Sequence, residues 1–289
     1  MPVRSTLRGQ GTLWRRKPHG TGWRRLASFA MTQTKRGVPH LFDRWEQISK
    51  KIYAANDIRL FLDFDGTLVP YCDSPEDVKL SGEGRRILER LARHRRVHVA
   101  IVSGRRNAAL RKYVRAPRVQ LLGLFGWENN RGPALPYMTR EVFRRLRSVV
   151  APLHTSFPGI RVEDKGASYA VHFRGASPNV QRCAQLRIRR LLARSRPDFR
   201  VIRSNHACEI VPFHVLGKGV AMREFIRVLP APFLPIYVGD DLTDEPAFMA
   251  LRSGITVRVG PFSRTRAHFR LKDPAEVRIF LERLAEELS

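Results

Sequence analysis

The chain has 289 residues, of which 43% are hydrophobic, and it carries a formal net charge of +27. Such a composition supports a buried core and excludes wholesale disorder, and no apolar run approaches the roughly 20 residues needed to cross a bilayer. Three widely spaced cysteines, Cys72, Cys183 and Cys208, form neither a disulfide framework nor a metal-binding pair, which favours a reducing, cytoplasmic location.

Residues 1–40 hold nine basic side chains and no acidic one, and their composition changes abruptly at Leu41. No apolar period is sustained there, so we predict a disordered basic tail. The apolar stretch of a secretory signal does not follow the arginines in this segment. A translation start at Met31 would account for the tail as well as a function would.

From Leu41 to Phe125 the apolar spacing alternates between helical and strand periods. Alternation of this kind predicts a doubly wound parallel sheet with helices on both faces. The expected strands are 58–62, 97–102 and 119–125, and the expected helices cover 41–52, the region around 87–91, and a segment from Asn107.

After residue 132 the order changes to a helix, two strands, a second helix and two more strands, over 141–150, 160–163, 168–174, 180–191, 200–202 and 208–211. This order is typical of an antiparallel sheet with helices on one face. We therefore predict an inserted α+β domain over 131–212, called the cap below, and an α/β core made of 41–130 and 213–289. The second part of the core is expected to contain helices from Lys218, Asp244 and Pro274 and strands over 235–238 and 255–259.

Polar clusters follow three of the predicted core strands, at 63–67, 103–105 and 239–241. Ligands of open parallel sheets collect beyond the carboxyl ends of the strands, so we expect one crevice to gather these clusters. Gly66 allows a tight turn in which backbone amides approach a phosphate. The two aspartates of the first cluster and Asp240 offer the oxygen ligands that Mg²⁺ prefers.

The segments 61–70, 103–105, 217–219 and 239–245 together resemble the four-part signature of the haloacid dehalogenase superfamily. Within it, the cap segments 162–166 and 170–174 and the later Glu209 are similar to those of the trehalose-6-phosphate phosphatases. The resemblance covers roughly residues 56–285. It implies a Mg²⁺-dependent phosphatase of trehalose biosynthesis that hydrolyses trehalose 6-phosphate through an aspartyl-phosphate.

The resemblance also implies a role for each residue at a matching position. Asp63 would be the nucleophile and Asp65 the general acid and base, while Ser103 and Lys218 would hold the transferring phosphoryl group. Mg²⁺ would be bound by Asp63, the Asp65 carbonyl and Asp240, and supported by Asp241 and Asp244. The implied substrate contacts are Asp63, Phe64, Asp65, Thr67, Arg105, Glu163, Lys165, Arg174 and Glu209.

Each of these residues also has an ordinary structural reading. Lys218 alone would be a surface lysine, Ser103 a helix cap, and Arg105 the partner of a neighbouring acid. Glu163 and Lys165 could belong to an exposed sheet face held by salt bridges. The sequence departs from the family at Phe125, where a histidine is common, and at residues 205 and 206, Asn205 and His206, where a basic residue is common.

Three functions remain open on the residues themselves. The first is the phosphatase named above, which requires a sugar phosphate and is compatible with a separate trehalose-phosphate synthase in the same pathway. The second is a related phosphatase acting on another sugar phosphate, or on a glycosyl-glycerol or glycerate phosphate. The third is a polyanion or nucleic-acid binder, which the net charge favours but the spacing of aromatic and basic residues does not. The sequence does not indicate an oligomeric state.

Overall fold

The structure is a computed structural model. It describes residues 37–72, 78–129, 132–133, 140–166, 168–193, 198–204, 207–213, 215–230, 232–261 and 264–289. Residues 1–36, which form most of the predicted basic tail, lie outside the described residues, and residues 37–289 make up a compact unit of their own.

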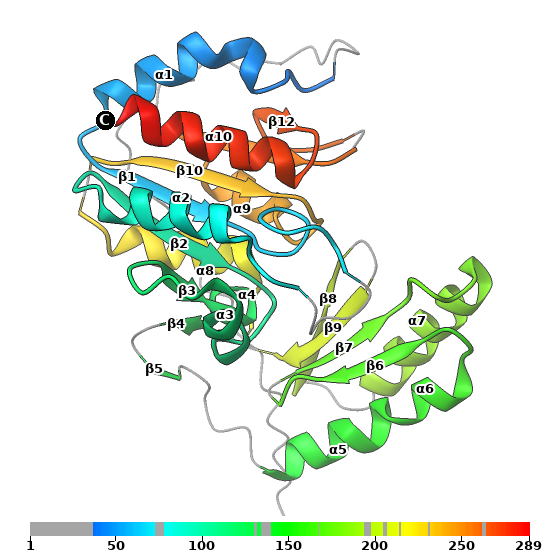
Figure 1. Cartoon of the computed structure of the whole chain (residues 1–289). Coiled ribbons are helices and arrows are strands. Elements are labelled where there is room, and N and C mark those ends of the chain that lie inside the picture. Colours follow the sequence, from blue (N-terminus) through cyan, green and yellow to red (C-terminus); the bar gives the residue numbers. More distant parts are fainter. Residues whose placement is uncertain are drawn as a thin grey trace, which may run out of the picture. The chain divides into compact units, whose positions relative to one another are not determined.

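Six parallel strands form the core sheet in the order β12-β11-β10-β1-β2-β3 (Figure 1). The strand order reverses between β1 and β10, which lie side by side, so this is the switch point where parallel sheets bind ligands. The bounds are β1 Ile58–Leu62, β2 Val97–Val102, β3 Gln120–Leu122, β10 Leu234–Gly239, β11 Ile255–Val259 and β12 Phe269–Leu271.

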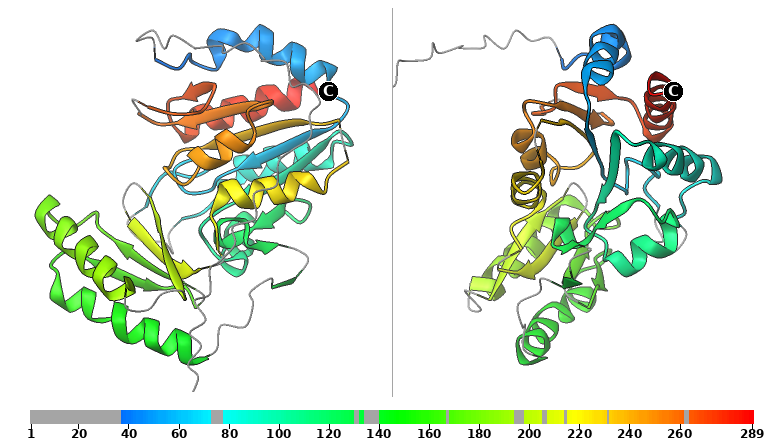
Figure 2. Two further views of the ribbon diagram at one scale, coloured as in Figure 1. Left: turned by 180° about the vertical axis from the view of Figure 1, so that it is seen from behind. Right: turned by 90° about the vertical axis from the view of Figure 1, so that its left-hand side faces the viewer.

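Helices cover both faces of this sheet because alternate residues of its buried strands point to opposite sides. Figure 2 shows helices on both sides of the sheet. On β1, Leu60 and Leu62 pack with α1, α2, α3 and α10, whereas Phe61 packs with α8 and α9. The helices are α1 Trp45–Ala54, preceded by the 3₁₀ turn Phe42–Arg44, α2 Gly82–Arg93, α3 Asn107–Val114, α8 Lys218–Arg227, α9 Glu245–Ala250 and α10 Pro274–Glu287. Among the described residues, none of the helices is long and apolar enough to span a membrane.

A second sheet is antiparallel, with the order β6-β7-β9-β8. Its strands are β6 Arg161–Asp164, β7 Tyr169–His172, β8 Phe199–Arg203 and β9 Ala207–Pro212, and its helices are α5 Arg140–Val150, α6 Pro152–Ser156 and α7 Pro178–Ala193. Val171 and Ile210 pack against these helices, so their neighbours Ala170 and Glu209 face the other way. The predicted fold class, a doubly wound core with an α+β cap, is confirmed. The cap boundaries at 131 and 212 stay a prediction.

The strand predicted over 119–125 is wrong beyond Leu122. The chain turns there into α4, Gly123–Gly126, in which Leu124 and Phe125 have φ of 47° and 61°. Their N–H groups donate to the carbonyls of Arg105 and Ser103 at 2.9 and 2.8 Å, which ties the turn to the end of β2. A continuous apolar run does not distinguish such a buried turn from a strand. The chain then forms a short antiparallel pair, β4 Glu128–Asn129 with β5 Gly132–Pro133.

The last residues of the predicted tail, 37–40, belong to the folded unit. The Arg270 N–H on β12 donates to the Pro39 carbonyl at 3.0 Å, and the Leu41 N–H donates to the Arg270 carbonyl at 2.9 Å. His40 also contacts Glu276 at the start of α10 at 2.8 Å. An edge strand presents unpaired backbone groups, and residues 37–41 pair with some of those on β12. Composition alone does not reveal this pairing, so the predicted disorder is wrong for residues 37–40.

The three thiols differ in exposure. Cys208 is buried on β9, where burial and the nearby Glu209 raise its pKa to about 12, while Cys72 and Cys183 are exposed. The thiolate is the reactive form, so iodoacetamide at neutral pH should modify Cys72 and Cys183 in the folded protein and all three thiols after denaturation. Intact-mass measurement counts the adducts, and rapid labelling of Cys208 in the native protein would contradict the buried β9.

Candidate active site

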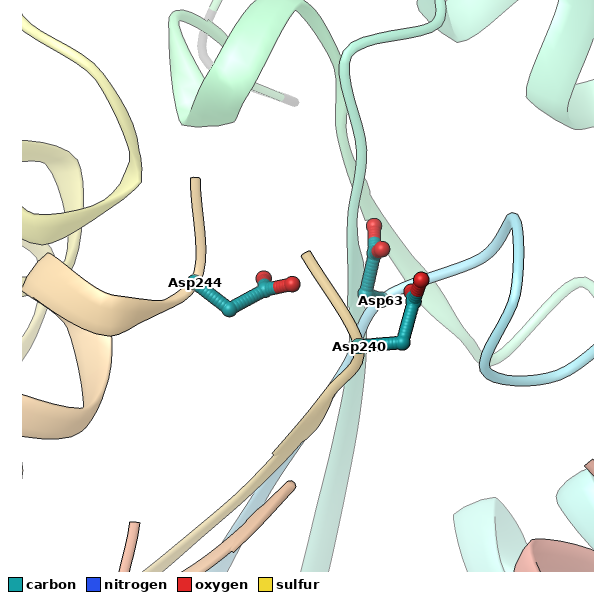
Figure 3. Close-up of side chains that lie close together, drawn as sticks. All are labelled: Asp63, Asp240 and Asp244. Atoms are coloured by element: carbon teal, nitrogen blue, oxygen red, sulfur yellow. The ribbon is translucent and has the colours of Figure 1, made fainter. Parts of the chain in front are cut away.

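Three buried carboxylates meet at the switch point of the core sheet. Asp63 follows β1, Asp240 follows β10, and Asp244 stands at the start of α9. One oxygen of each lies within 4.8 Å of the others, and Figure 3 shows the side chain of Asp244 pointing toward Asp63. The pairing of Leu62 with Val238 sets Asp63 and Asp240 at neighbouring strand ends, as the sequence predicted.

Lys218 lies between two of these carboxylates. Its Nζ is 2.7 Å from Asp63 Oδ1 and 2.8 Å from Asp244 Oδ1, and the residue is only 2% exposed. Burial alone would lower the pKa of Lys218, but Asp244 and Asp63 outweigh burial and raise it. Lys218 is therefore a charged group inside the site and not the surface lysine that its sequence alone suggests.

Asp244 is fully buried, and protein donors occupy three of the four lone pairs of its two oxygens. Oδ1 accepts from Lys218 and from the Tyr237 hydroxyl, both at 2.8 Å, and Oδ2 accepts from the Asp241 N–H at 2.9 Å. These bonds fix Asp244 as the group that holds Lys218 against Asp63. The oxygens available to a cation are then mainly those of Asp63 and Asp240.

The cluster carries more negative charge than Lys218 balances. Burial and the nearby Asp244 and Asp240 raise the pKa of Asp63 well above its usual value, although Lys218 opposes them. Burial and the carboxylates of Asp244 and Asp241 likewise raise the pKa of Asp240, to about 7. A bound divalent cation would relieve this repulsion, and an all-oxygen set of ligands suits Mg²⁺. The residues present therefore fit that ion.

Asp65 is held by Arg105 at the edge of the site. The Arg105 Nε–H and NH2 groups each donate to one Asp65 oxygen at 2.7 Å. Burial lowers the pKa of Arg105, but the bonds to Asp65 outweigh it and raise the pKa. Ser103 is 1% exposed, and its Oγ accepts from the Arg105 N–H at 3.1 Å, which orients the hydroxyl at the end of β2. Arg105 thus pairs with a neighbouring acid, one of the two roles left open by the sequence.

A cavity of about 610 Å³ joins these core residues to the cap sheet. Glu163, Ala170 and Glu209 stand opposite one another on β6, β7 and β9, so they form one row on the sheet face away from the cap helices. The core contributes Asp63, Asp65, Ser103, Arg105, Lys218 and Asp241, and the cap contributes Glu163, Lys165, His172, Arg174 and Glu209. The predicted cap residues therefore face the same cavity as the predicted catalytic ones.

The cap side of the cavity is organised by two polar contacts, Lys165 with Glu209 and His172 with Glu163. Lys165 contacts Glu209 through Nζ, which also donates to the Gly104 carbonyl of the core at 3.4 Å. Burial lowers the pKa of Lys165, but Glu209 and Glu163 outweigh it and raise the pKa. His172 lies 2.8 Å from Glu163, and this contact together with Lys165 overcomes burial and lowers the pKa of Glu163 to about 2. Glu163 and Glu209 thus present carboxylate groups to the cavity.

Two predicted substrate residues do not line the cavity with their side chains. Phe64 is fully buried, with its ring stacked on Tyr113 at 6.4 Å, and Thr67 is fully buried, with its hydroxyl donating to Asp240 at 3.0 Å. Phe125 does line the cavity, whereas residues 205 and 206, Asn205 and His206, lie outside the described residues.

Three further residues of the site escaped the sequence analysis. Tyr71 and His172 line the cavity, and Tyr237 holds Asp244 from within β10. The alternation along β7 places His172 on the same face as Ala170, which was a usable signal. Tyr71 carries no such signal, because its hydroxyl contacts Asp240 from a distant part of the chain, and the contact of Tyr237 with Asp244 crosses from a strand to the following helix without a periodic pattern.

The fold and the acidic strand ends define the class of protein first. A haloacid dehalogenase-like hydrolase from Bacteroides thetaiotaomicron superposes with a TM-score of 0.56 at 17% identity, covering 78% of this chain and 99% of that one. The C-terminal domain of C. albicans trehalose-6-phosphate phosphatase superposes with a TM-score of 0.76 at 21% identity, covering 88% of this chain and 99% of that one. Both likenesses show a haloacid dehalogenase-like fold.

Sequence comparison gives the family. The profile of the trehalose-phosphatase family matches residues 61–275. A trehalose 6-phosphate phosphatase of Zea mays is 32% identical over 262 residues, which is 80% of this chain and 70% of that protein. The chain therefore belongs to the trehalose-phosphatase family, a family of phosphoric monoester hydrolases.

Proposed function

We propose that this protein is a Mg²⁺-dependent phosphatase that hydrolyses trehalose 6-phosphate through an aspartyl-phosphate on Asp63. One observation carries the proposal: a single cavity is lined by Asp63, Lys218 and Ser103 of the core and by a row of carboxylates on the cap. The first group suits a phosphoryl centre, and the second suits the hydroxyls of a sugar. Family membership supports the same substrate.

The core residues divide the hydrolysis into two displacements. An Asp63 oxygen attacks phosphorus, the bond from phosphorus to the sugar oxygen breaks, and Asp65 gives that oxygen a proton. In the second step a water oxygen attacks the phosphorus, its proton passes to Asp65, and the bond to Asp63 breaks to release phosphate. Arg105 occupies both Asp65 oxygens, so one of these hydrogen bonds must be exchanged when Asp65 transfers a proton.

The charges around Asp63 are suited to an anionic ester. Asp63, the Asp65 carbonyl and Asp240 would hold the Mg²⁺, which supplies positive charge that offsets the repulsion between the Asp63 carboxylate and the phosphate. Lys218 offers a second, permanent positive charge beside Asp63, and Ser103 offers a hydroxyl donor. Asp244 supports this arrangement by holding Lys218, and Asp241, which accepts from the Thr243 hydroxyl, is proposed to support the cation.

The cap residues are proposed to select the sugar. Glu163 and Glu209 accept hydrogen bonds from hydroxyls, Lys165 donates, and Arg174 adds a positive charge at the same cavity. A site that hydrogen-bonds specific hydroxyls rejects esters that lack them, because its buried polar groups are then left unpaired. Specificity should therefore depend on the cap more than on the core.

A panel of phosphate esters tests the substrate. Among trehalose 6-phosphate, sucrose 6-phosphate, glucose 6-phosphate, a glucosylglycerol phosphate and p-nitrophenyl phosphate, we expect the highest kcat/KM for trehalose 6-phosphate, measured as phosphate released. Glu209→Gln should lower kcat/KM for trehalose 6-phosphate by at least about 10-fold, because a buried carboxylate that accepts from the sugar is lost. The same variant should change turnover of p-nitrophenyl phosphate little, since that ester has no sugar. A better substrate elsewhere in the panel would refute the assignment.

A further inference from the structure

Tyr71 lines the cavity and comes two residues after Val69, where the turn that follows the predicted nucleophile Asp63 ends. Its hydroxyl donates to Asp240 Oδ2 at 2.6 Å, and the Thr67 hydroxyl donates to Asp240 Oδ1 at 3.0 Å. Both oxygens of Asp240 therefore accept a hydrogen bond from the loop that follows β1. Each carboxylate oxygen has a second lone pair, so these bonds orient Asp240 and leave it able to bind a cation.

The ring of the same tyrosine contacts the cap. The Arg174 guanidinium carbon lies 5.4 Å from the centre of the Tyr71 ring, within the range of a cation–π contact. Arg174 comes two residues after the end of β7 and lines the cavity. Tyr71, which is 43% exposed, thus touches a proposed cation ligand of the core with one end and a cap side chain with its ring face.

The turn at Gly66 is shaped around this contact. Gly66 has φ of +80°, and a Cβ added there would lie 2.5 Å from Tyr71 Cε2 and 2.3 Å from Asp240 Oδ2. Real Cβ atoms do not approach other heavy atoms so closely, so the absence of a side chain at Gly66 is what admits both groups. The pairing of Tyr71 with Asp240 is therefore packed into the catalytic loop and is not a chance surface contact.

We propose that Tyr71 is a positioning residue that connects the cation site to the cap: its hydroxyl orients Asp240, and its ring holds Arg174 over the cavity. The inference rests on the proposed function, because it takes Asp240 as a Mg²⁺ ligand. Hydrogen bonds that orient a metal ligand change metal affinity by about 10- to 100-fold. Tyr71 contacts both Asp240 and Arg174. A cation bound at Asp240 therefore favours the position of Tyr71 that holds Arg174, and the contact with Arg174 favours the orientation of Asp240 that binds the cation.

Two substitutions separate the two contacts. Tyr71→Phe removes the hydroxyl and keeps the ring, so Mg²⁺ affinity should fall about 10-fold or more while KM for trehalose 6-phosphate at saturating Mg²⁺ stays within twofold. Tyr71→Leu removes both contacts, so it should show the same loss of Mg²⁺ affinity together with an increase in KM of about 2- to 5-fold. Tyr53→Phe, at a tyrosine of α1 that is 78% exposed, is the matched control and should change neither quantity.

Isothermal calorimetry of the full chain with Mg²⁺ alone, without substrate, measures the affinity, and thermal unfolding confirms that the variants are folded. Lower Mg²⁺ affinity in Tyr71→Phe and a raised KM confined to Tyr71→Leu would support the inference. Equal Mg²⁺ affinity in Tyr71→Phe and the unsubstituted protein would overturn it, as would equal KM values for the two variants. If the unsubstituted protein itself binds no Mg²⁺, the cation assignment of the proposed function fails together with the inference. If the unsubstituted protein and Tyr71→Phe bind Mg²⁺ equally well, only the inference fails.

Discussion

Asp63→Asn should abolish turnover while leaving the protein folded. The amide cannot form the aspartyl-phosphate, and loss of a nucleophile costs on the order of 10⁴-fold or more in kcat. Stability should not fall in parallel, because Asp63 is a buried carboxylate close to Asp240 and Asp244 and its pKa is raised. Removing its charge relieves repulsion, and Lys218 keeps its partner Asp244. Phosphate release and thermal unfolding measure the two effects.

The matched control is Asp43→Asn, the same chemical change at an exposed position before α1. It should alter neither turnover nor Tm. Mass spectrometry of the Asp63→Asn protein excludes conversion of the asparagine back to aspartate, which would restore activity artificially. Turnover within 10-fold of the unsubstituted protein in a verified sample would rule out a covalent intermediate on Asp63 and leave only a role in binding.

The core was predictable because its signals are local. Strands buried on both faces read as short apolar runs, and the strand predicted over 255–259 has the same bounds in the structure. The polar residues that follow β1, β2 and β10 converge because parallel strands end at one edge of the sheet. The three segments that were predicted to share one crevice each contribute a residue to the cavity, namely Asp63, Ser103 and Asp241.

Other parts of the site depend on contacts between distant residues, and these leave no periodic signal. The left-handed backbone at Leu124 and Phe125 is held by carbonyls of Ser103 and Arg105, so an apolar run that resembles a strand becomes a turn. The hydrogen bonds that Asp244 accepts from Lys218, the Tyr237 hydroxyl and the Asp241 N–H also have no periodic signal, and its expected support of a metal stays a prediction. Pairing of this kind is decided by burial, which composition does not report.

Lys218 holds two buried carboxylates and is proposed to act in catalysis, and a pair of substitutions can separate these roles. Its ammonium group lies between Asp63 and Asp244, which are both buried, so removing it leaves two carboxylates facing each other without compensation. Breaking a buried ion pair from one side costs about 3–5 kcal/mol of stability. The same ammonium is proposed to hold the transferring phosphoryl oxygens, and loss of such a donor costs about 10²- to 10³-fold in rate.

Lys218→Met, which keeps the length of the side chain and removes its charge, should therefore lower both kcat and the free energy of unfolding. Adding Asp244→Asn removes one of the two uncompensated carboxylates, so the double variant should recover stability while kcat stays low. Lys51→Met on the exposed face of α1 is the control and should change neither. Urea unfolding gives stability and phosphate release gives kcat. Recovery of kcat together with stability in the double variant would mean that Lys218 serves only to hold the acidic cluster together, and the phosphoryl contact would have to be reassigned to Ser103 or Arg105.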